Sequence, residues 1–130
     1  AHLSLVGLDD WTTGAQAPRE LALQARAGDC TVVISHTPDA LPALSNYPAP
    51  DGGRWIDLML SGHTHGGQIT LFGLRPLLLR TQYGDRYWRG WYIENGARLL
   101  VSSGVGTTGL PLRLGAPPQA HLITLRKLED

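Results

Sequence analysis

Short apolar runs alternate along the chain with polar stretches rich in glycine and proline. Runs of apolar or β-branched residues bounded by turn residues are typical of buried strands. These runs predict strands at residues 3–8, 31–35, 55–61, 68–73 and 121–128. Two further apolar runs flank Asn95-Gly96, a dipeptide that favours the tight turn of a β-hairpin. The chain is therefore predicted to be rich in strands.

Two segments have a helical pattern instead. Apolar positions recur at helical spacing in residues 18–27, with Pro18 at the start and Gly28 just after the end. Residues 37–47 suit a short helix that begins near their first proline, and residues 48–54, with two prolines and two glycines, suit a loop. The order of elements predicts an α/β fold that begins with alternating strands and helices and continues as antiparallel sheet.

The composition fits one globular domain without a membrane span. The chain has 130 residues, of which 42% are apolar and 17% charged, and its eleven basic and eleven acidic residues cancel. General electrostatic attraction to nucleic acid is therefore not expected. Six arginines give the second half a mildly basic character, which suits a solvated face: Arg75, Arg80, Arg86, Arg89, Arg98 and Arg113. The single cysteine, Cys30, adjoins an apolar run, so we expect a buried, unreactive thiol.

Three of the predicted strands end in side chains that can bind a ligand. Asp9 and Asp10 follow the first strand, His36 follows the second, and Gly62-His63-Thr64-His65 follows the third. Loops at the carboxyl ends of strands converge over an α/β sheet, which brings distant residues together. Neutral imidazole is a common metal ligand, and residues two apart in an extended backbone point to the same side. We therefore expect His36, His63 and His65 to form one metal-binding cluster, with solvated histidines in a surface loop as the alternative.

Several motifs resemble a known enzyme superfamily. SHTPD (35–39), SGHTHGGQ (61–68) and VSSGVGTTGLPLRLGAPPQAHLITL (101–125) resemble the C-terminal half of the calcineurin-like metallophosphoesterases, in the bacterial phosphohydrolase branch that carries G-H-T-H-G-G-Q. VGLDD (6–10) is similar to a segment of the same branch. The resemblance implies that residues 1–130 are a single partial domain, the C-terminal part of a two-sheet αββα sandwich with a two-metal site at its edge.

The resemblance also implies a reaction and a set of metal ligands. His36 and His63 would bind one divalent ion and His65 the other, and a metal-bound hydroxide would hydrolyse a phosphomonoester or phosphodiester. Two ions are expected in the full-length protein, and manganese, iron, zinc and nickel are all suitable. Asp10, Gln68 and Arg113 are further candidates, for supporting a metal ligand or contacting the substrate.

The remaining ligand motifs of the family are missing. The sequence has no D-x-H, no G-D-x-x-[DN] and no G-N-H-[DE], so the carboxylates that the family uses to hold two cations are not identified in it. We therefore expect the chain to be inactive alone and to associate with a missing N-terminal half or with itself. Two alternatives are a non-catalytic assembly domain that retains the fold and a mononuclear zinc hydrolase that uses the three histidines.

The segment LFGLRPLLLR (71–80) and the aromatic residues that follow it are unusually apolar. Core packing in antiparallel strands is one explanation. The other is a lid or groove for a lipid-like substrate at a membrane surface. A bacterial cytoplasmic or membrane-peripheral location is the corresponding expectation.

Overall fold

A five-stranded mixed sheet is the centre of the fold in the computed structural model, which describes residues 2–77 and 81–126. Its strands, in spatial order, are β1 (Leu3–Gly7), β2 (Cys30–Ser35), β3 (Leu58–Ser61), β7 (Ala97–Val101) and β6 (Gly90–Glu94). The first four strands run parallel, and β6 pairs with β7 in antiparallel fashion through the turn at Asn95-Gly96. The fold is therefore α/β in character, as expected.

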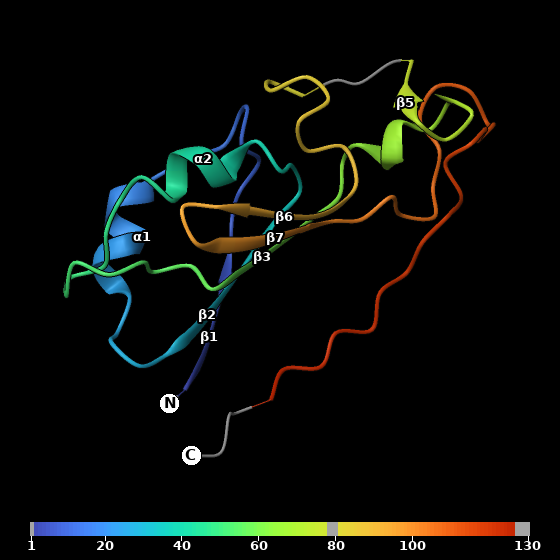
Figure 1. The fold of residues 1–130 in the computed structure, drawn as a ribbon. Helices are drawn as coiled ribbons and strands as arrows, with labels where there is room; N and C mark the ends of the chain where they lie inside the picture. The colour runs from blue at the N-terminus through green and yellow to red at the C-terminus, as the bar shows by residue number, and fades with distance from the viewer. Residues whose placement is uncertain (1, 78–80, 127–130) are drawn as a thin grey trace.

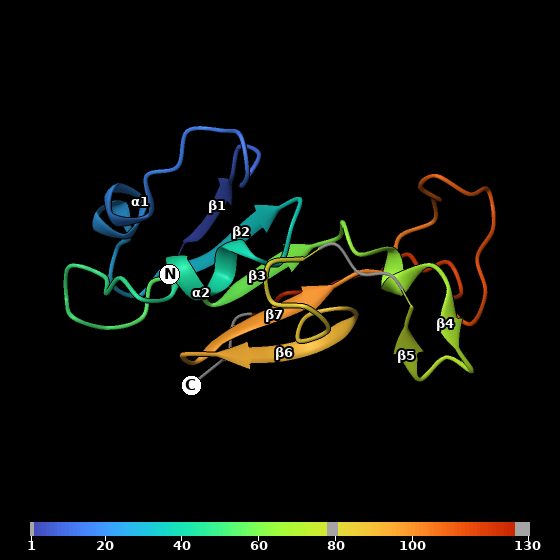
Figure 2. The same cartoon turned by 90° about the horizontal axis from the view of Figure 1, so that it is seen from above.

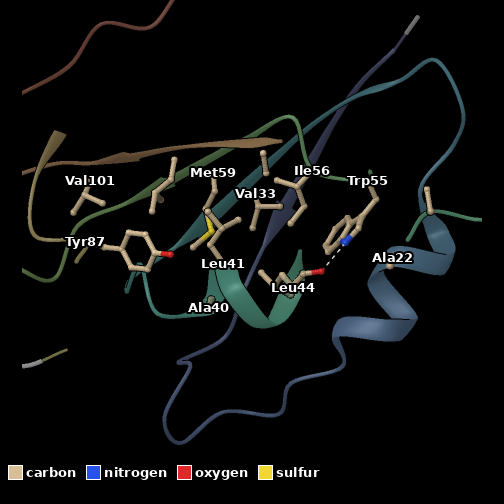
Figure 3. Packing of buried hydrophobic residues seen from close by; sticks show 13 residues of the cluster. Ala22, Val33, Ala40, Leu41, Leu44, Trp55, Ile56, Met59, Tyr87 and Val101 are labelled. Carbon is tan, nitrogen blue, oxygen red and sulfur yellow. Dashed lines mark hydrogen bonds between the residues drawn. The ribbon is translucent and has the colours of Figure 1, made fainter. Parts of the chain in front are cut away.

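Two short helices cover one face of this sheet (Figure 1). They are α1 (Pro18–Gln24) and α2 (Ala40–Leu44). Val33, Met59 and Leu99 from the central strands pack against Leu41 and Leu44 of α2, and all five are fully buried. Trp55 closes one end of this core, and its indole Nε1 donates a hydrogen bond to the carbonyl oxygen of Leu44 at 3.0 Å (Figure 3).

The opposite face of the sheet is only partly covered. Strand residues alternate between the two faces, so the neighbours of the core residues point the other way. Leu5, Ile34, Trp91 and Ile93 on this face are exposed, whereas Val32, Leu58 and Leu100 between them are buried. The C-terminal segment passes along this side of the sheet in both ribbon views (Figures 1 and 2).

A smaller unit follows the sheet at the carboxyl ends of β2, β3 and β7 (Figure 2). It consists of the 3-10 turn η1 (His65–Gly67) and the two-stranded ladder of β4 (Thr70–Leu71) with β5 (Arg75–Pro76). Ile69 forms an isolated parallel bridge with Leu114, which ties the later loop to this unit.

Most of the predicted elements are present, several of them shorter than predicted, whereas β2 begins one residue earlier, at Cys30. The predicted helix over 18–27 ends at Gln24, and the run 55–61 is strand only from Leu58 onward. The predicted strand at 121–128 is wrong for residues 121–126, which form no ladder, and its last two residues lie outside the described part. An apolar alternation without a neighbouring strand edge to pair with cannot form sheet.

Cys30 is half-buried, and that burial raises the pKa of its thiol.

Candidate metal centre at the strand ends

The pairing register brings His36 and His63 together. Ser35 is the partner of Ser61 in the parallel pair β2–β3, so both strands end at the same level. His36 follows β2 directly, and the amide of Gly62 donates to the carbonyl oxygen of His36 at 3.1 Å. This bond sets the backbones side by side where the histidines leave the sheet.

The two imidazole rings face each other through nitrogen atoms. His63 Nδ1 lies 3.1 Å from His36 Nε2, with ring centroids 4.9 Å apart and the planes at 70°. Two nitrogens that ligate one cation at about 2.0–2.1 Å each lie roughly 3.0–3.4 Å apart. The observed separation fits that arrangement when neither nitrogen carries a proton, and fits an N–H···N hydrogen bond when one does. Both side chains are exposed, so a cation can reach them.

A hollow of about 390 Å³ lies beside this pair. His36, His63, Asp10 and Asp39 are among its lining residues, together with Gln82. Asp39 is buried, and its Oδ2 accepts a hydrogen bond from the backbone amide of Gln82 at 2.7 Å. Its other oxygen, Oδ1, is buried and has no hydrogen-bond partner among the described residues. Asp39 therefore anchors the segment at Gln82 to the wall of the hollow.

Asp10 caps a turn at the same edge of the sheet. Its Oδ1 accepts hydrogen bonds from the amides of Thr12 and Thr13 and from the Thr13 hydroxyl, at 3.0, 2.8 and 2.9 Å. These bonds, those from Thr13 first, hold the pKa of Asp10 below its ordinary value, and the charge of His36 acts in the same direction. The carboxylate is exposed and is used to order its own turn.

The loop after His63 is not extended. His63 and His65 have φ of 67° and 52°, and Gly66, Gly67 and Gln68 also have positive φ. Positive φ is uncommon for residues other than glycine, although histidine adopts it more readily than most. The premise that these two histidines point to the same side of an extended strand is therefore wrong. Histidine in this conformation is one of the strained features that gather at functional sites.

His65 has surroundings of its own. Its Nδ1 lies 3.3 Å from the carbonyl oxygen of Gly106, and its Nε2 lies 3.3 Å from the hydroxyl of Thr108. Both ring nitrogens therefore face the loop after β7 rather than the His36–His63 pair. A histidine whose Nδ1–H donates to a carbonyl presents Nε2 as its ligand atom, which is a common arrangement at metal sites.

Gln68 holds this loop in place. Its Nε2 donates to the carbonyl oxygens of Thr108 and Leu110 at 3.0 and 2.9 Å, and its Oε1 accepts from the amide of Thr108 at 2.7 Å. These bonds fix Thr108, whose hydroxyl lies beside Nε2 of His65. Gln68 therefore acts on His65 through Thr108.

Arg113 is bonded to backbone carbonyls. Its guanidinium donates to the carbonyl oxygens of His65, Ser103, Gly106 and Ala116 at 2.6–3.0 Å. These four bonds join the His65 turn to the loop after β7. The geometry supports a role in holding that loop, and a contact of Arg113 with substrate stays a prediction.

Across residues 2–77 and 81–126, no three or more His, Cys, Asp or Glu side chains are grouped so as to hold a metal ion. The described residues thus supply two adjacent nitrogen ligands and a third, separate histidine. This donor set fits part of a metal centre and needs anionic ligands from elsewhere. The roles of His36, His63 and His65 as metal ligands stay predictions.

The structure thus places two histidines at the carboxyl edge of an α/β sheet, and comparison with known proteins gives the family. A Bacillus subtilis (strain 168) protein, the uncharacterized metallophosphoesterase YkuE, is 38% identical over 128 residues, which is 97% of this chain and 41% of that protein. The uncharacterized metallophosphoesterase Cj0846 of Campylobacter jejuni is 33% identical over 127 residues, covering 94% of this chain and 29% of its own length.

A bovine protein named transmembrane protein with metallophosphoesterase domain is 31% identical over 131 residues, covering 95% of this chain and 28% of that protein. No family model and no solved structure matches the chain. These relatives show that the chain belongs to the calcineurin-like metallophosphoesterases. It spans less than half the length of these curated relatives. Among the helices in the described residues, none has the length and apolar character to cross a membrane.

Sequence reasoning missed the residues that support the histidines. Gly106 and Thr108 contact His65, and Gln82 is held by Asp39, yet none of these was singled out. Asp39 lies within the SHTPD motif, three residues after His36. This short spacing could have predicted that Asp39 lies near the candidate site. The contacts of Gly106 and Thr108 span more than forty residues of sequence, and no local pattern predicts them.

Proposed function

We propose that the protein is a metal-dependent phosphoesterase whose active site includes the His36–His63 edge of this chain. The observation that carries the proposal is the 3.1 Å separation of His36 Nε2 and His63 Nδ1 at the aligned ends of two parallel strands. The relationship to metallophosphoesterases supports hydrolysis of a phosphomonoester or phosphodiester as the reaction.

Each histidine has a distinct part in this proposal. His36 and His63 would hold one cation through the facing nitrogens, and Nε2 of His65, which faces the hydroxyl of Thr108 in this structure, would be the donor to a second. When bound there, divalent cations would supply positive charge that compensates a phosphate group and lowers the pKa of water. Gly106 orients the imidazole of His65 through its carbonyl oxygen, and Gln68 keeps Thr108 close to it. Manganese, iron, zinc and nickel all accept such donors.

Within residues 2–77 and 81–126 no carboxylate joins the histidines in a metal-holding group, so we propose that carboxylate ligands come from outside this chain. Imidazole is neutral when it binds a metal, so three histidines leave the charge of two divalent ions uncompensated. The chain covers 41% of the length of YkuE, so the remaining part of a longer parent protein is a suitable source. We propose that this part packs on the partly covered sheet face, where exposed Leu5, Ile34, Trp91 and Ile93 require a partner.

Hydrolysis of an aryl phosphodiester with added manganese tests the proposal in the full reading frame that contains this chain. His63→Ala should abolish turnover, because it removes a metal ligand. His121→Ala is the matched control, since His121 is exposed and lies away from the strand ends. Turnover that survives His63→Ala, or that is lost equally in His121→Ala, would contradict the assignment.

A further inference from the structure

An exposed apolar surface borders the His65 turn. It is formed by the β4–β5 hairpin and by the loop after Thr108, and we call it the apolar rim; its residues are Leu71, Phe72, Leu74, Leu77, Leu110 and Leu112. All six are more than half exposed, with Phe72 at 88% and Leu74 at 81%. The amide of Thr70 donates to the carbonyl oxygen of Leu114 at 2.8 Å, which joins the hairpin to the loop. A cluster of large apolar side chains left in water marks a contact surface.

The hairpin tip is ordered by specific bonds. The amide of Leu74 donates to the carbonyl oxygen of Leu71 at 3.0 Å, and the turn between them places Phe72 and Gly73 at positive φ. The guanidinium of Arg89 donates to the carbonyl oxygen of Gly73 and lies 4.2 Å from the centre of the Trp88 ring. A stacked arginine and tryptophan therefore support the base of the exposed tip. Amphipathic residues of this kind are favoured where apolar and aqueous phases meet.

The sequence segments that form the apolar rim contain basic residues and no acidic ones. Residues 58–130 contain eight basic and four acidic residues, whereas residues 1–57 contain three basic and seven acidic ones. No acidic residue occurs in the segments 66–84 and 95–126, which include the whole rim. Basic residues beside an apolar surface are attracted to the anionic headgroups of a bilayer. A second copy of the chain would present the same positive charge, which disfavours self-association through this surface.

The apolar rim is continuous with the candidate active site. Gln68 Nε2 donates to the carbonyl oxygen of Leu110, a rim residue, and to that of Thr108, whose hydroxyl lies beside His65. We propose that the apolar rim docks on an anionic lipid surface, with Phe72 and Leu74 entering the interface and the histidine edge facing the headgroups. Given the proposed phosphoesterase function, on which this last step rests, the substrate class is a phosphate ester that carries apolar chains.

Co-sedimentation of the 130-residue chain with vesicles tests the docking surface without turnover. Vesicles of equimolar phosphatidylglycerol and phosphatidylcholine should bind the chain, and vesicles of phosphatidylcholine alone should bind it more weakly. The double variant Phe72→Ser, Leu74→Ser should weaken binding roughly tenfold or more, because two anchoring side chains are lost. The matched control Leu23→Ser, Leu122→Ser removes two exposed apolar residues that belong neither to the apolar rim nor to the sheet, and it should bind as the parent chain does.

Equal losses in the two double variants would overturn the proposal, because they would indicate non-specific adhesion. Gel filtration that shows a dimer broken by Phe72→Ser, Leu74→Ser would also overturn it, because a second copy would then be the occupant of the rim.

The substrate class is tested in the active parent protein. The rim variant should lose hydrolysis of a vesicle-borne phosphate ester and keep hydrolysis of a soluble aryl ester. Failure on both esters by the unmodified protein would count against the phosphoesterase assignment and leave vesicle binding as a separate result.

Discussion

The His36–His63 pair and the His65 turn contain the same kind of side chain in different settings. The pair leaves two regular parallel strands at the same level, and its ring nitrogens face each other across 3.1 Å. His65 lies in a turn of positive φ, and its ring nitrogens face Gly106 and Thr108. Strand register and the bond from the amide of Gly62 to His36 bring the pair together, although His63 itself has φ of 67°. His65 depends instead on a loop held by Gln68 and Arg113. The two settings should therefore respond differently to substitution.

Removal of a paired histidine should have the largest effect. In the isolated chain, His36→Ala or His63→Ala should weaken zinc binding by roughly a hundredfold or more, since even a supporting residue is worth about 10–100-fold. His65→Ala should change the affinity of the chain for zinc little, because its nitrogens lie away from the pair. Isothermal titration calorimetry measures the three variants. Equal losses in all three would remove the distinction between the two settings.

The His65 turn can be distorted without touching a histidine. Gly67 has φ of 79°, and an added Cβ would lie 2.4 Å from Cβ of Pro76. Gly67→Ala should therefore lower the free energy of unfolding by about 2–4 kcal/mol, from backbone strain and overpacking together. Urea unfolding measures it, with Gly104→Ala as control: Gly104 has φ of 60° but open space around it, so only strain of about 1–2 kcal/mol applies. An equal cost at both glycines would show that the Pro76 contact is not tight.

Loss of the Gln68 side chain should loosen the support of His65. Gln68→Ala removes three hydrogen bonds to Thr108 and Leu110. The free energy of unfolding should fall by about 1 kcal/mol, because bonds near solvent are worth little individually. Amide exchange at Thr108 should accelerate, and the NMR signals of His65 should move while those of His36 stay. Gln24→Ala in α1 is the control, and a shift of the His36 signals as large as that of His65 would contradict the separation.

The smallest expected effect concerns Asp10. Hydrogen bonds from Thr13 and Thr12 hold the pKa of Asp10 below 3.8, the ordinary value. A carboxyl whose pKa is lowered by folding contributes stability above its ordinary pKa, and this contribution is lost as pH falls through the lowered value. The stability difference between the parent chain and Asp10→Asn should therefore shrink in strong acid. Urea unfolding from neutral pH downward measures it; a difference that grows in acid would mean that the shift has the opposite sign.

The sequence predicted the pair better than the turn, for a physical reason. Apolar runs and the polar residues that end them are local patterns, so the sequence correctly predicts that His36 and His63 follow strands. The parallel pairing of β2 with β3 then brings the two histidines side by side. The conformation of His65 depends on Gly106, Thr108 and Arg113, which are distant in sequence. A local pattern that assumes extended backbone cannot anticipate a turn with five consecutive or near-consecutive positive φ values at 63 and 65–68.

The predicted strand at 121–128 illustrates the same limit. Its alternation is that of a strand, but residues 121–126 pair with no neighbour. A segment can form a β-ladder only where the unpaired edge of another strand lies beside it. The sequence of the segment does not predict where such an edge lies. Hydrophobic pattern therefore predicted element type well where partners were close in the fold, as in the hairpin at Asn95-Gly96.

The most direct test is a crystal structure of the chain grown with manganese or zinc and measured at the anomalous edge of the metal. We predict one anomalous peak bonded to both Nε2 of His36 and Nδ1 of His63, with the imidazole of His65 outside its coordination shell. A chain whose two facing rings stay hydrogen-bonded to each other in saturating metal, or whose metal binds at any other residues, would contradict this prediction.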